Sequence, residues 1–358
     1  MWPGPAHEHI YLCIYWDWER ELLHSSGASK MADKPSRALL LYGDGLAGSI
    51  GPHHTHLHSF ASRACCGFLA LPHTPHPGNE DARTIREFLE LLDANEAFDN
   101  AIINLQCLTI PFMMHQDAEG LVEHKSLEKC EFLTIRERFM GMKAAVITDN
   151  SSSRTIGDKL GLSVFQWNEL CKDSHSQVRM PDLASEILGL IGFKEGKTLD
   201  TSQFDLVFAH IGANQKILDL KEIELVNDLA GEVMNIAESG IDLNSRLHMS
   251  IIMSYGSTLG DDLLNVSLPY ADSTKYRELS SVVPRQSYAF KGGKPRENFR
   301  HHSPMLLAQF QNAVTRKDMV EMFSFKDFEA NGGNLVIPAD RLLHEVAFKL
   351  WKTPKYGA

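Results

Sequence analysis

Asp44 is the acidic residue whose position most directly suggests chemistry. It follows a short apolar run, Leu39–Tyr42, and lies between Gly43 and Gly45. An aspartate at the C-terminal end of a buried parallel strand is where an α/β enzyme places a cation ligand. We therefore treat Asp44 as a candidate metal ligand whose partners must come from elsewhere in the chain.

The segment 53–58, HHTHLH, places four histidines within six residues. Imidazole nitrogens at this density can bind zinc or nickel. Because the segment itself contains no carboxylate, we favour a solvated loop in which His56 and His58 enter a helix, and a built metal site is the alternative.

A basic segment, 284–302, stands out in an otherwise acidic chain. It has five lysines and arginines against one glutamate, a net charge of +4, and it also contains three aromatic residues. A phosphate-bearing ligand or an acidic partner would suit it, and a solvated loop at a sheet edge is the alternative.

Two polar positions after the apolar run 144–148 allow a functional and a structural interpretation. Asp149 could supply a ligand, but Asp-Asn-Ser is also an ordinary helix start, which we favour. The serines at 151–153 would act as nucleophiles only beside a base, and a serine-rich loop is the commoner explanation.

The elements that would position these residues alternate between strands and helices. Short apolar runs predict strands at 39–42, 144–148, 163–165, 205–210, 249–254 and 335–338, and 56–71 is predicted as helix, turn and strand. Periodic patterns predict helices at 80–97, at 216–238, from Ser303–Pro304 through Val314, after Ser324 and at 340–351. The alternation predicts an α/β fold whose mostly parallel central sheet is flanked by helices.

The domain organisation predicted is a poorly ordered extension over 1–30 followed by one domain, 31–358. Met31 begins a natural-looking N-terminus, so a chain starting there should fold as stably as the full one. Residues 98–135 have apolar runs without a clean period and are predicted to be an insertion.

Composition excludes several classes of protein. The chain has 358 residues, 43% of them hydrophobic, and a net charge of −11, which argues against general nucleic-acid binding and against a membrane-surface role. Its apolar stretches are strand-sized, so no membrane span is predicted. The six cysteines form neither a disulfide framework nor a CxxC pair, and Cys65 and Cys66 are expected in the core. We expect a cytoplasmic protein.

Three segments together resemble the alkaline phosphatase superfamily, and within it the cofactor-independent phosphoglycerate mutase-like proteins. They are YGDG at 42–45, HLHSFASRACCGFLAL at 56–71, and FDLVFAHIGANQKILDLKEIELVND at 204–228, the last preceded by AAVITDNSSSRTIGDKLGLSVFQ at 144–166. The resemblance covers roughly residues 37–310 in patches. It implies an alkaline-phosphatase-like core, with Ile156–Gly157 at the family's Gly-Ile-Gly turn.

The resemblance also assigns metal ligands, several of which are replaced. Asp44 matches the first ligand position, and 205–210 matches the strand that ends in His210. Gln215 and Lys216 stand near the positions of the family's next Asp and His, while Tyr255 and Gly256 stand where it has Asp-His. Gln215 offers one neutral oxygen and Lys216 adds a positive charge, so a normal two-metal centre is not expected.

The resemblance and the basic segment together imply two sets of candidate site residues. The metal candidates are Asp44, His210, His301 and His302, for at most one divalent ion such as Mn, Mg or Zn, with no nucleotide cofactor. The candidate ligand-binding residues are Lys216, Arg285, Lys291, Arg296 and Arg300. We interpret the chain as a phosphoglycerate mutase-like pseudoenzyme that binds a phosphorylated small molecule or a protein partner. The alternative is an active metal-dependent phosphotransferase or phosphohydrolase of the same family.

Overall fold

A computed structural model of the protein describes residues 36–72, 80–95, 133–170, 179–212, 221–256, 290–291, 294–296, 299–300, 303–333 and 335–353. The predictions for residues 1–30 and for Lys216, Arg285, His301 and His302 lie outside the described residues, as does most of the insertion predicted at 98–135.

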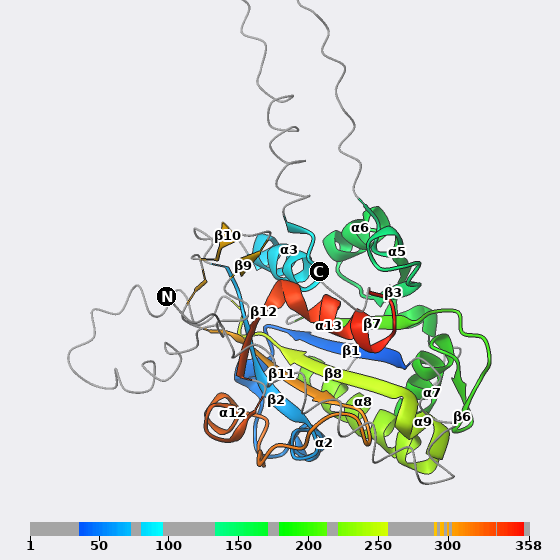
Figure 1. The fold of residues 1–358 in the computed structure, drawn as a ribbon. Coiled ribbons are helices and arrows are strands. Elements are labelled where there is room, and N and C mark those ends of the chain that lie inside the picture. The colour runs from blue at the N-terminus through cyan, green and yellow to red at the C-terminus, as the bar shows by residue number, and fades with distance from the viewer. Residues whose placement is uncertain are drawn as a thin grey trace, which may run out of the picture. The chain divides into compact units, whose positions relative to one another are not determined.

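An eight-stranded, mostly parallel sheet forms the centre of the described chain, in the order β12-β2-β11-β8-β1-β7-β3-β4 (Figure 1). Only β11 runs antiparallel to its neighbours in this sheet, β2 and β8. The strands are β1 (Arg37–Asp44), β2 (Cys65–Ala70), β3 (Ala144–Ile147), β4 (Ser163–Phe165), β7 (Leu206–Gly212), β8 (Leu247–Met253), β11 (Met305–Phe310) and β12 (Leu335–Pro338). The short strands β5 (Phe193–Lys194) and β6 (Lys197–Thr198) form one hairpin, and β9 (Phe290–Lys291) and β10 (Lys294–Pro295) form another.

Helices cover both faces of the sheet (Figure 1). On one face lie α2 (Thr55–Ala61), α7 (Met180–Leu190), α8 (Glu222–Ser239), α9 (Ile241–Arg246) and α12 (Phe325–Asn331). On the other lie α3 (Glu80–Leu91), α5 (Ile135–Arg138), α6 (Ser151–Lys159) and α13 (Leu342–Lys349). Short 3₁₀ turns are η2 (Ala47–Ser49), η3 (Trp167–Leu170) and η6 (Ala339–Arg341).

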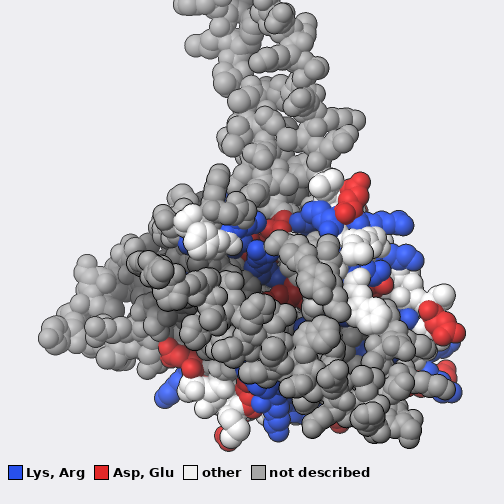
Figure 2. Space-filling model, in the orientation of Figure 1, with Lys and Arg blue, Asp and Glu red and all other residues white. Residues whose placement is uncertain are grey.

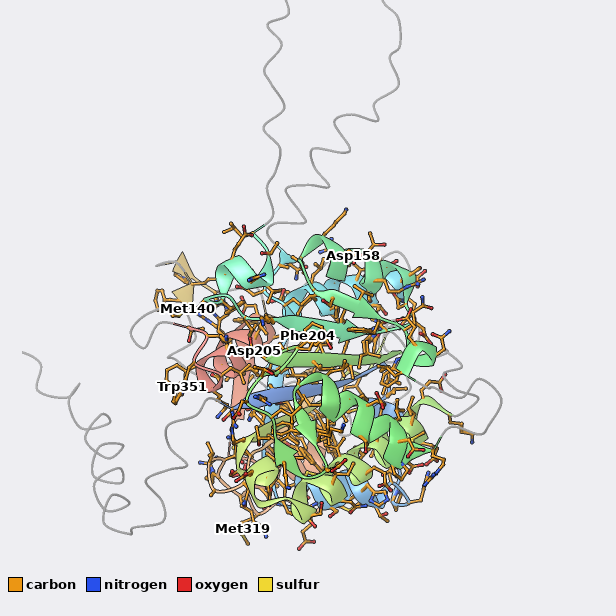
Figure 3. All side chains as sticks on the ribbon, turned by 90° about the vertical axis from the view of Figure 1, so that its right-hand side faces the viewer. Met140, Asp158, Phe204, Asp205, Met319 and Trp351 are labelled. Atoms are coloured by element: carbon orange, nitrogen blue, oxygen red, sulfur yellow. The ribbon has the colours of Figure 1, made fainter. Side chains whose placement is uncertain are left out.

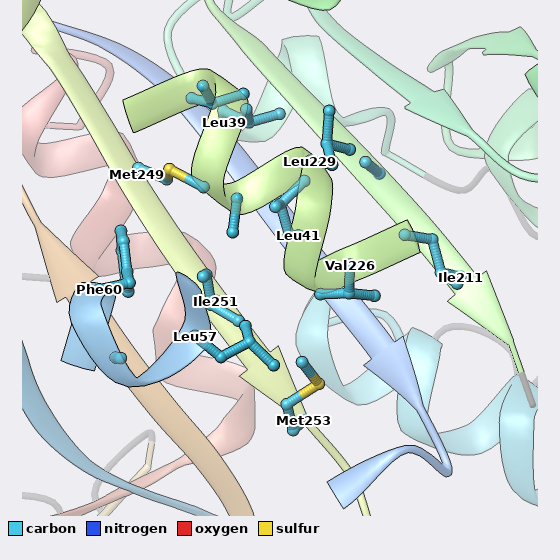
Figure 4. Packing of buried hydrophobic residues seen from close by; sticks show 14 of the residues in the cluster. Leu39, Leu41, Leu57, Phe60, Ile211, Val226, Leu229, Met249, Ile251 and Met253 are labelled. Carbon is cyan, nitrogen blue, oxygen red and sulfur yellow. The ribbon is translucent and has the colours of Figure 1, made fainter. Parts of the chain in front are cut away.

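Strand β1 explains why the two apolar layers form. Successive side chains of a strand point to opposite faces, so Leu39 and Leu41 join the layer under α2 and α8, while Leu40 and Tyr42 join the opposite layer. Figure 4 shows Leu39 and Leu41 with Met249, Ile251 and Met253 of β8, against Val226 and Leu229 of α8. A strand that is buried on both faces needs no alternation of polar and apolar residues, and the run Leu39–Tyr42 shows no such alternation.

The end of the sheet at which the parallel strands begin is closed by polar and apolar side chains. Figure 3 labels Phe204 and Asp205, directly before β7. Phe204 is buried in the core, and Asp205 Oδ2 accepts the backbone amide of Lys143 at 2.9 Å. This bond ties the residue before β3 to the residue before β7.

Most of the predicted elements are confirmed. The strands predicted at 163–165 and 335–338 have the predicted bounds, and the other four strands, the helix–strand unit at 56–71 and the last helix differ at their ends. Ser324 caps α12 by accepting the amide of Asp327, as its sequence predicted. Cys65 and Cys66 are free and buried.

The helix predicted from Ser303–Pro304 is wrong, because β11 occupies this segment. Met305 to Gln309 are almost wholly buried between β2 and β8. Methionine, leucine, alanine and glutamine favour helices intrinsically, but pairing with two neighbouring strands overrides that preference. The predicted turn at Ile156–Gly157 is also wrong, since both residues lie inside α6.

None of the helices among the described residues combines the length and the apolar character that a membrane crossing requires.

Candidate functional site

Asp44 lies at the C-terminal end of the central strand β1, next to the ends of β7 and β8. It pairs with Gly212 in the parallel register, and its side chain is almost wholly buried. The carboxyl ends of parallel strands are where α/β proteins place ligands. His210 of β7 lies close, with Nε2 3.6 Å from Asp44 Oδ2. Asp44 therefore lies at the C-terminal end of a buried parallel strand, as its sequence context predicts, with His210 beside it.

Both carboxylate oxygens of Asp44 have protein partners. Oδ1 lies 2.6 Å from Arg83 Nη2 and accepts longer hydrogen bonds from Tyr42 and Ser254, at 3.3 and 3.2 Å. Oδ2 accepts a 2.6 Å hydrogen bond from Thr84 Oγ1. Burial alone raises the pKa of this carboxyl, but the neighbouring His210 imidazole and the charge of Arg83 outweigh it and hold the pKa well below its usual range.

Arg83 is the centre of a buried ion-pair cluster. Its guanidinium contacts Asp44, Glu80 and Glu87, with Nη1 2.6 Å from Glu87 Oε2. Burial alone lowers the pKa of Arg83, but the charges of Glu87 and Asp44 outweigh it and raise the pKa. Glu87 also accepts from Tyr42 at 3.2 Å and from Arg300 Nη2 at 3.3 Å. Three carboxylates and two guanidinium groups thus lie together, at Asp44, Glu80, Glu87, Arg83 and Arg300.

The contribution of α3 to this cluster was not predicted from the sequence. Residues three and four apart share a helix face, so Glu80, Arg83 and Glu87 point the same way from α3. The signal was present as an EDARTIRE segment, in which an arginine is flanked by acids at i−3 and i+4. It resembled an ordinary exposed salt-bridged helix, and only the fold brings it against Asp44.

The described residues around Asp44 do not fit a divalent metal. A metal ligand needs a free oxygen lone pair directed at the ion, whereas both Asp44 oxygens already have donors, one of them a cation. Even two unit positive charges 4 Å apart repel by about 4 kcal/mol at an effective dielectric of about 20. A dication beside Arg83 would be repelled more strongly, so the arrangement does not support a metal-dependent step.

Two aromatic rings and one hydrogen-bonding hydroxyl fix the position of the His210 imidazole. Its ring stacks on Tyr42 and Phe88, with centroids 5.3 and 5.8 Å away. Nδ1 lies 2.9 Å from Thr148 Oγ1, while Nε2 faces Asp44 without a hydrogen-bond partner among the described residues. The packing fixes the imidazole in place beneath Asp44.

The segment after β8 supplies a hydroxyl and close backbone packing. Ser254 Oγ donates to Asp44 and accepts the amide of Gly45 at 2.9 Å. Gly256 has a φ of 70°, and a Cβ there would lie 3.1 Å from Gly45 Cα. The backbone after β8 therefore packs directly against Gly45, beside Asp44.

The three candidate phosphate-binding cations that the structure describes are paired with acids. Lys291 Nζ lies 2.8 Å from Asp93 and 3.0 Å from Asp340, and its pKa is raised because these two partners outweigh the effect of burial. Arg296 makes two hydrogen bonds to Asp340, at 2.8 and 2.6 Å. Arg300 donates to Ser303 O at 2.8 Å and to Glu87. On the face shown in Figure 2, basic and acidic side chains are likewise interspersed.

The histidines of segment 53–58 separate into three environments. His54 is buried and His53 exposed, and the ligand atoms of both lie within 4.8 Å of Glu224 on α8 and of one another. His58 lies in α2, where Nδ1 accepts the amide of Phe323 and Nε2 lies 3.1 Å from Gly51 O. His56 is exposed on α2. The predicted entry of His56 and His58 into a helix is confirmed.

Asp149 and the residue after it, Asn150, make structural contacts at the start of α6. Asp149 Oδ1 accepts the amide of Trp167 at 3.1 Å, and Asn150 caps α6 by accepting the amide of Ser153 at 2.8 Å. The helix start predicted here is confirmed, with Asn150 as the capping residue.

Comparison with known proteins gives structural neighbours alone. No family model matches the chain, and no curated protein matches it. A protein from Pyrococcus horikoshii is 11% identical with a TM-score of 0.45, and the match covers 91% of this chain and 99% of that one. A cofactor-independent phosphoglycerate mutase from Thermoplasma acidophilum is 11% identical with a TM-score of 0.32, covering 60% of this chain and 38% of that one.

A member of the alkaline phosphatase superfamily from Vibrio parahaemolyticus is 9% identical with a TM-score of 0.38, and the match covers 79% of this chain and 61% of that one. Because these TM-scores lie below 0.5, we base no functional conclusion on the neighbours. The function of the chain must be inferred from the residues around Asp44.

Proposed function

We propose that this chain is a catalytically impaired phosphoglycerate mutase-like protein that binds a phosphorylated ligand at the carboxyl edge of its sheet. The observation that supports this proposal is the contact between Arg83 and Asp44. A guanidinium lies 2.6 Å from the carboxylate that would otherwise bind a metal ion, and both side chains are buried.

The energetic consequence for catalysis is large. Metal-dependent phosphoryl transfer uses divalent cations to stabilise the attacking and leaving oxygens. A protein guanidinium already bound to three carboxylates offers little of that charge to a substrate. Each 1.36 kcal/mol of lost transition-state stabilisation slows a reaction about tenfold, so losing several kcal/mol leaves turnover very slow.

Arg300 is the cation best placed to meet a phosphate. Its Nη2 lies 3.3 Å from Glu87 Oε1, which is the longest of the ion pairs in this cluster, and its side chain is only partly exposed, at 17%. A phosphate group carries more charge than a carboxylate and accepts two parallel hydrogen bonds from arginine. A phosphorylated ligand could therefore displace Glu87 as the partner of Arg300.

The alternative of an active phosphotransferase has one contact in its favour. Thr84 donates to Asp44 at 2.6 Å, and a hydroxyl bonded to a carboxylate is one form of activated nucleophile. Thr84 is nearly buried, however, and its acceptor also binds Arg83. The burial of Thr84 and the contact of Asp44 with Arg83 favour a ligand-binding protein over an active phosphotransferase.

The test is turnover of phosphoglycerate and of an aryl phosphate with added Mn²⁺, in the full chain and in the Asp44→Asn variant. We expect negligible Mn²⁺-dependent turnover of both phosphate esters. Asp44→Asn should lower the free energy of unfolding by about 3 kcal/mol or more, because it leaves Arg83 short of a buried partner.

Asp158→Asn is the matched control, because Asp158 is exposed on α6 (Figure 3). It should leave both stability and any turnover unchanged. Robust Mn²⁺-dependent turnover that Asp44→Asn abolishes and Asp158→Asn retains would refute the proposal and favour the active enzyme. If the chain binds phosphoglycerate and Arg300→Gln weakens that binding about tenfold, the result would support a phosphorylated ligand bound by Arg300.

A further inference from the structure

A second set of metal-ligating side chains lies between the loop before α2 and the first turn of α8. His53 and His54 come from the loop, and Glu224 is the third residue of α8. His54 Nε2 is 3.5 Å and His53 Nε2 3.6 Å from the same oxygen, Glu224 Oε1. Residues far apart in sequence thus present two nitrogens and one oxygen to a common point.

These separations suit a metal better than hydrogen bonds. Ligands about 2.1 Å from a tetrahedral zinc ion are about 3.4 Å apart. The observed 3.5 and 3.6 Å are close to that spacing, and neither contact is a hydrogen bond in this structure. His54 Nε2 is buried and has no hydrogen-bond partner among the described residues, although an unpaired buried polar atom is costly. A bound ion would satisfy this nitrogen where it faces Glu224.

The exposure of the three side chains suits a site with one open position. The His54 side chain is 1% exposed, that of Glu224 38% and that of His53 68%. The buried histidine would anchor the ion, while the outer two close over it and leave a side toward solvent. Three protein ligands with an open fourth position are typical of zinc sites that bind water or substrate.

We propose that His53, His54 and Glu224 bind a divalent transition metal, Zn²⁺ or a similar borderline ion, with the fourth position open to water. Imidazole and carboxylate ligands at this number suit Zn²⁺ and not Mg²⁺, which needs six oxygens. The site is independent of Asp44, and its ligands are not part of the Arg83 cluster.

Binding requires a local exchange of a hydrogen bond. The amide of Gly51 donates to His54 Nδ1 at 2.8 Å, so Nδ1 carries a lone pair and Nε2 the proton. A neutral imidazole that binds metal through Nε2 carries its proton on Nδ1, so the Gly51 amide must move away. The 51–54 loop should therefore shift when the ion binds, which makes the Gly51 amide a reporter.

The other two histidines of the segment serve as internal comparisons. His58 bridges Phe323 N and Gly51 O through its two ring nitrogens. His56 is exposed and packs over Gly231. Its ring contacts neither Glu224 nor the Phe323 and Gly51 backbone groups that His58 binds. His56→Gln is therefore the matched control, with the same chemical change in the same histidine-rich segment.

The experiment titrates Co²⁺ into the full chain after chelator treatment, following the visible absorption of tetrahedral Co²⁺, with Zn²⁺ as competitor. His53→Gln and Glu224→Gln should each weaken Co²⁺ binding at least tenfold, and His56→Gln and Asp158→Asn should leave it unchanged. The Gly51 amide resonance should shift on addition of Zn²⁺ in the wild-type chain and not in Glu224→Gln.

Two outcomes would overturn the proposal. Equal weakening by His56→Gln and His53→Gln, with no effect of Glu224→Gln, would mean adventitious binding by a histidine-rich segment. The absence of tetrahedral Co²⁺ absorption in the wild-type chain would mean that the three side chains do not form a site. Glu224→Gln removes no packing contact that the fold needs, so the test does not depend on His54 variants that fail to fold.

Discussion

The interaction of Asp44 with Arg83 shows how one residue can change what a site does. A carboxylate at the end of a central strand invites a cation, and in this protein the cation is covalently part of α3. Desolvating both charges is costly, and the pair is maintained because Glu80 and Glu87 satisfy the remaining guanidinium donors. Asp44 therefore holds α3 against the end of β1 through this ion pair.

Glu90 is a single residue whose ionisation should make the stability of the fold depend on pH. It is buried on α3, and burial together with the charge of Asp340 raises its pKa to about 7. A carboxyl whose folded pKa lies above its unfolded pKa stabilises the fold at low pH. That contribution is full below about pH 4 and is lost as pH rises to about 7.

We expect Glu90→Gln to stabilise the protein at pH 8 by about 3 kcal/mol, because the pKa rises from 4.5 to about 7 and each pKa unit is worth about 1.36 kcal/mol. At pH 5 the variant and the wild-type chain should differ by much less. Urea unfolding at both pH values measures this. An equal difference at pH 5 and pH 8 would mean that the change acts through packing and not through the charge of Glu90.

At the scale of elements, Gly157 sets how closely α6 lies on the sheet. A Cβ on Gly157 would meet Val146 Cγ1 at 2.9 Å and Val164 Cγ2 at 3.1 Å. Both valines belong to strands of the central sheet, β3 and β4, so neither side chain can move away easily. The glycine is required for helix–sheet contact and not for a turn.

Overpacking a core usually costs about 1 to 3 kcal/mol, and alanine gains a helix about 1 kcal/mol. Because the added Cβ would meet two stiff valines, we expect the cost to exceed the gain, so that Gly157→Ala lowers the free energy of unfolding by up to about 2 kcal/mol. Gly189→Ala in α7 is the control, since a Cβ there meets nothing within 4 Å. Thermal unfolding of the two variants should shift in opposite directions, and a common direction would contradict the packing argument.

The same scale shows how far the sequence alone predicts the fold. Strands buried on both faces were identified because their apolar runs are short and bounded by turn residues, as at 335–338. β11 was not predicted because its residues intrinsically favour helices. Its strand conformation depends on pairing with β2 and β8, which the sequence of 305–310 alone does not indicate. Local patterns predict elements well only where tertiary pairing agrees with intrinsic preference.

The candidate site was predictable to a smaller extent. Asp44 and His210 could both be singled out from sequence, and they lie near the carboxyl ends of two neighbouring parallel strands, β1 and β7. Arg83 could not, because its role depends on α3 lying across the end of β1, a contact between segments about 40 residues apart. Glu224 was missed for the same reason, as its partners lie in a loop about 170 residues earlier.

For the molecule as a whole, β1 carries the stabilising contacts at both of its ends. Its last residue is Asp44, and its first residue, Arg37, donates to the carbonyls of Ile191, Gly192 and Leu199 at 3.0, 2.7 and 2.7 Å. Arg37 is nearly buried, and its guanidinium also lies 5.5 Å from the ring centroid of Phe193. The central strand thus holds the α7–β5–β6 segment, more than 150 residues further along the chain.

Arg37→Met should lower the free energy of unfolding of the whole described domain by about 3 kcal/mol, because three carbonyl oxygens lose a charged donor. Arg63→Met is the matched control, since Arg63 is partly exposed and pairs with the exposed Glu238, a contact worth about 1 kcal/mol or less. Urea unfolding followed by circular dichroism and by tryptophan fluorescence measures both. One coincident transition, shifted only in Arg37→Met, is expected because β1 lies between β7 and β8 in the sheet. A separate early transition of the β5–β6 hairpin, with the main transition unchanged, would mean that Arg37 holds only a local segment.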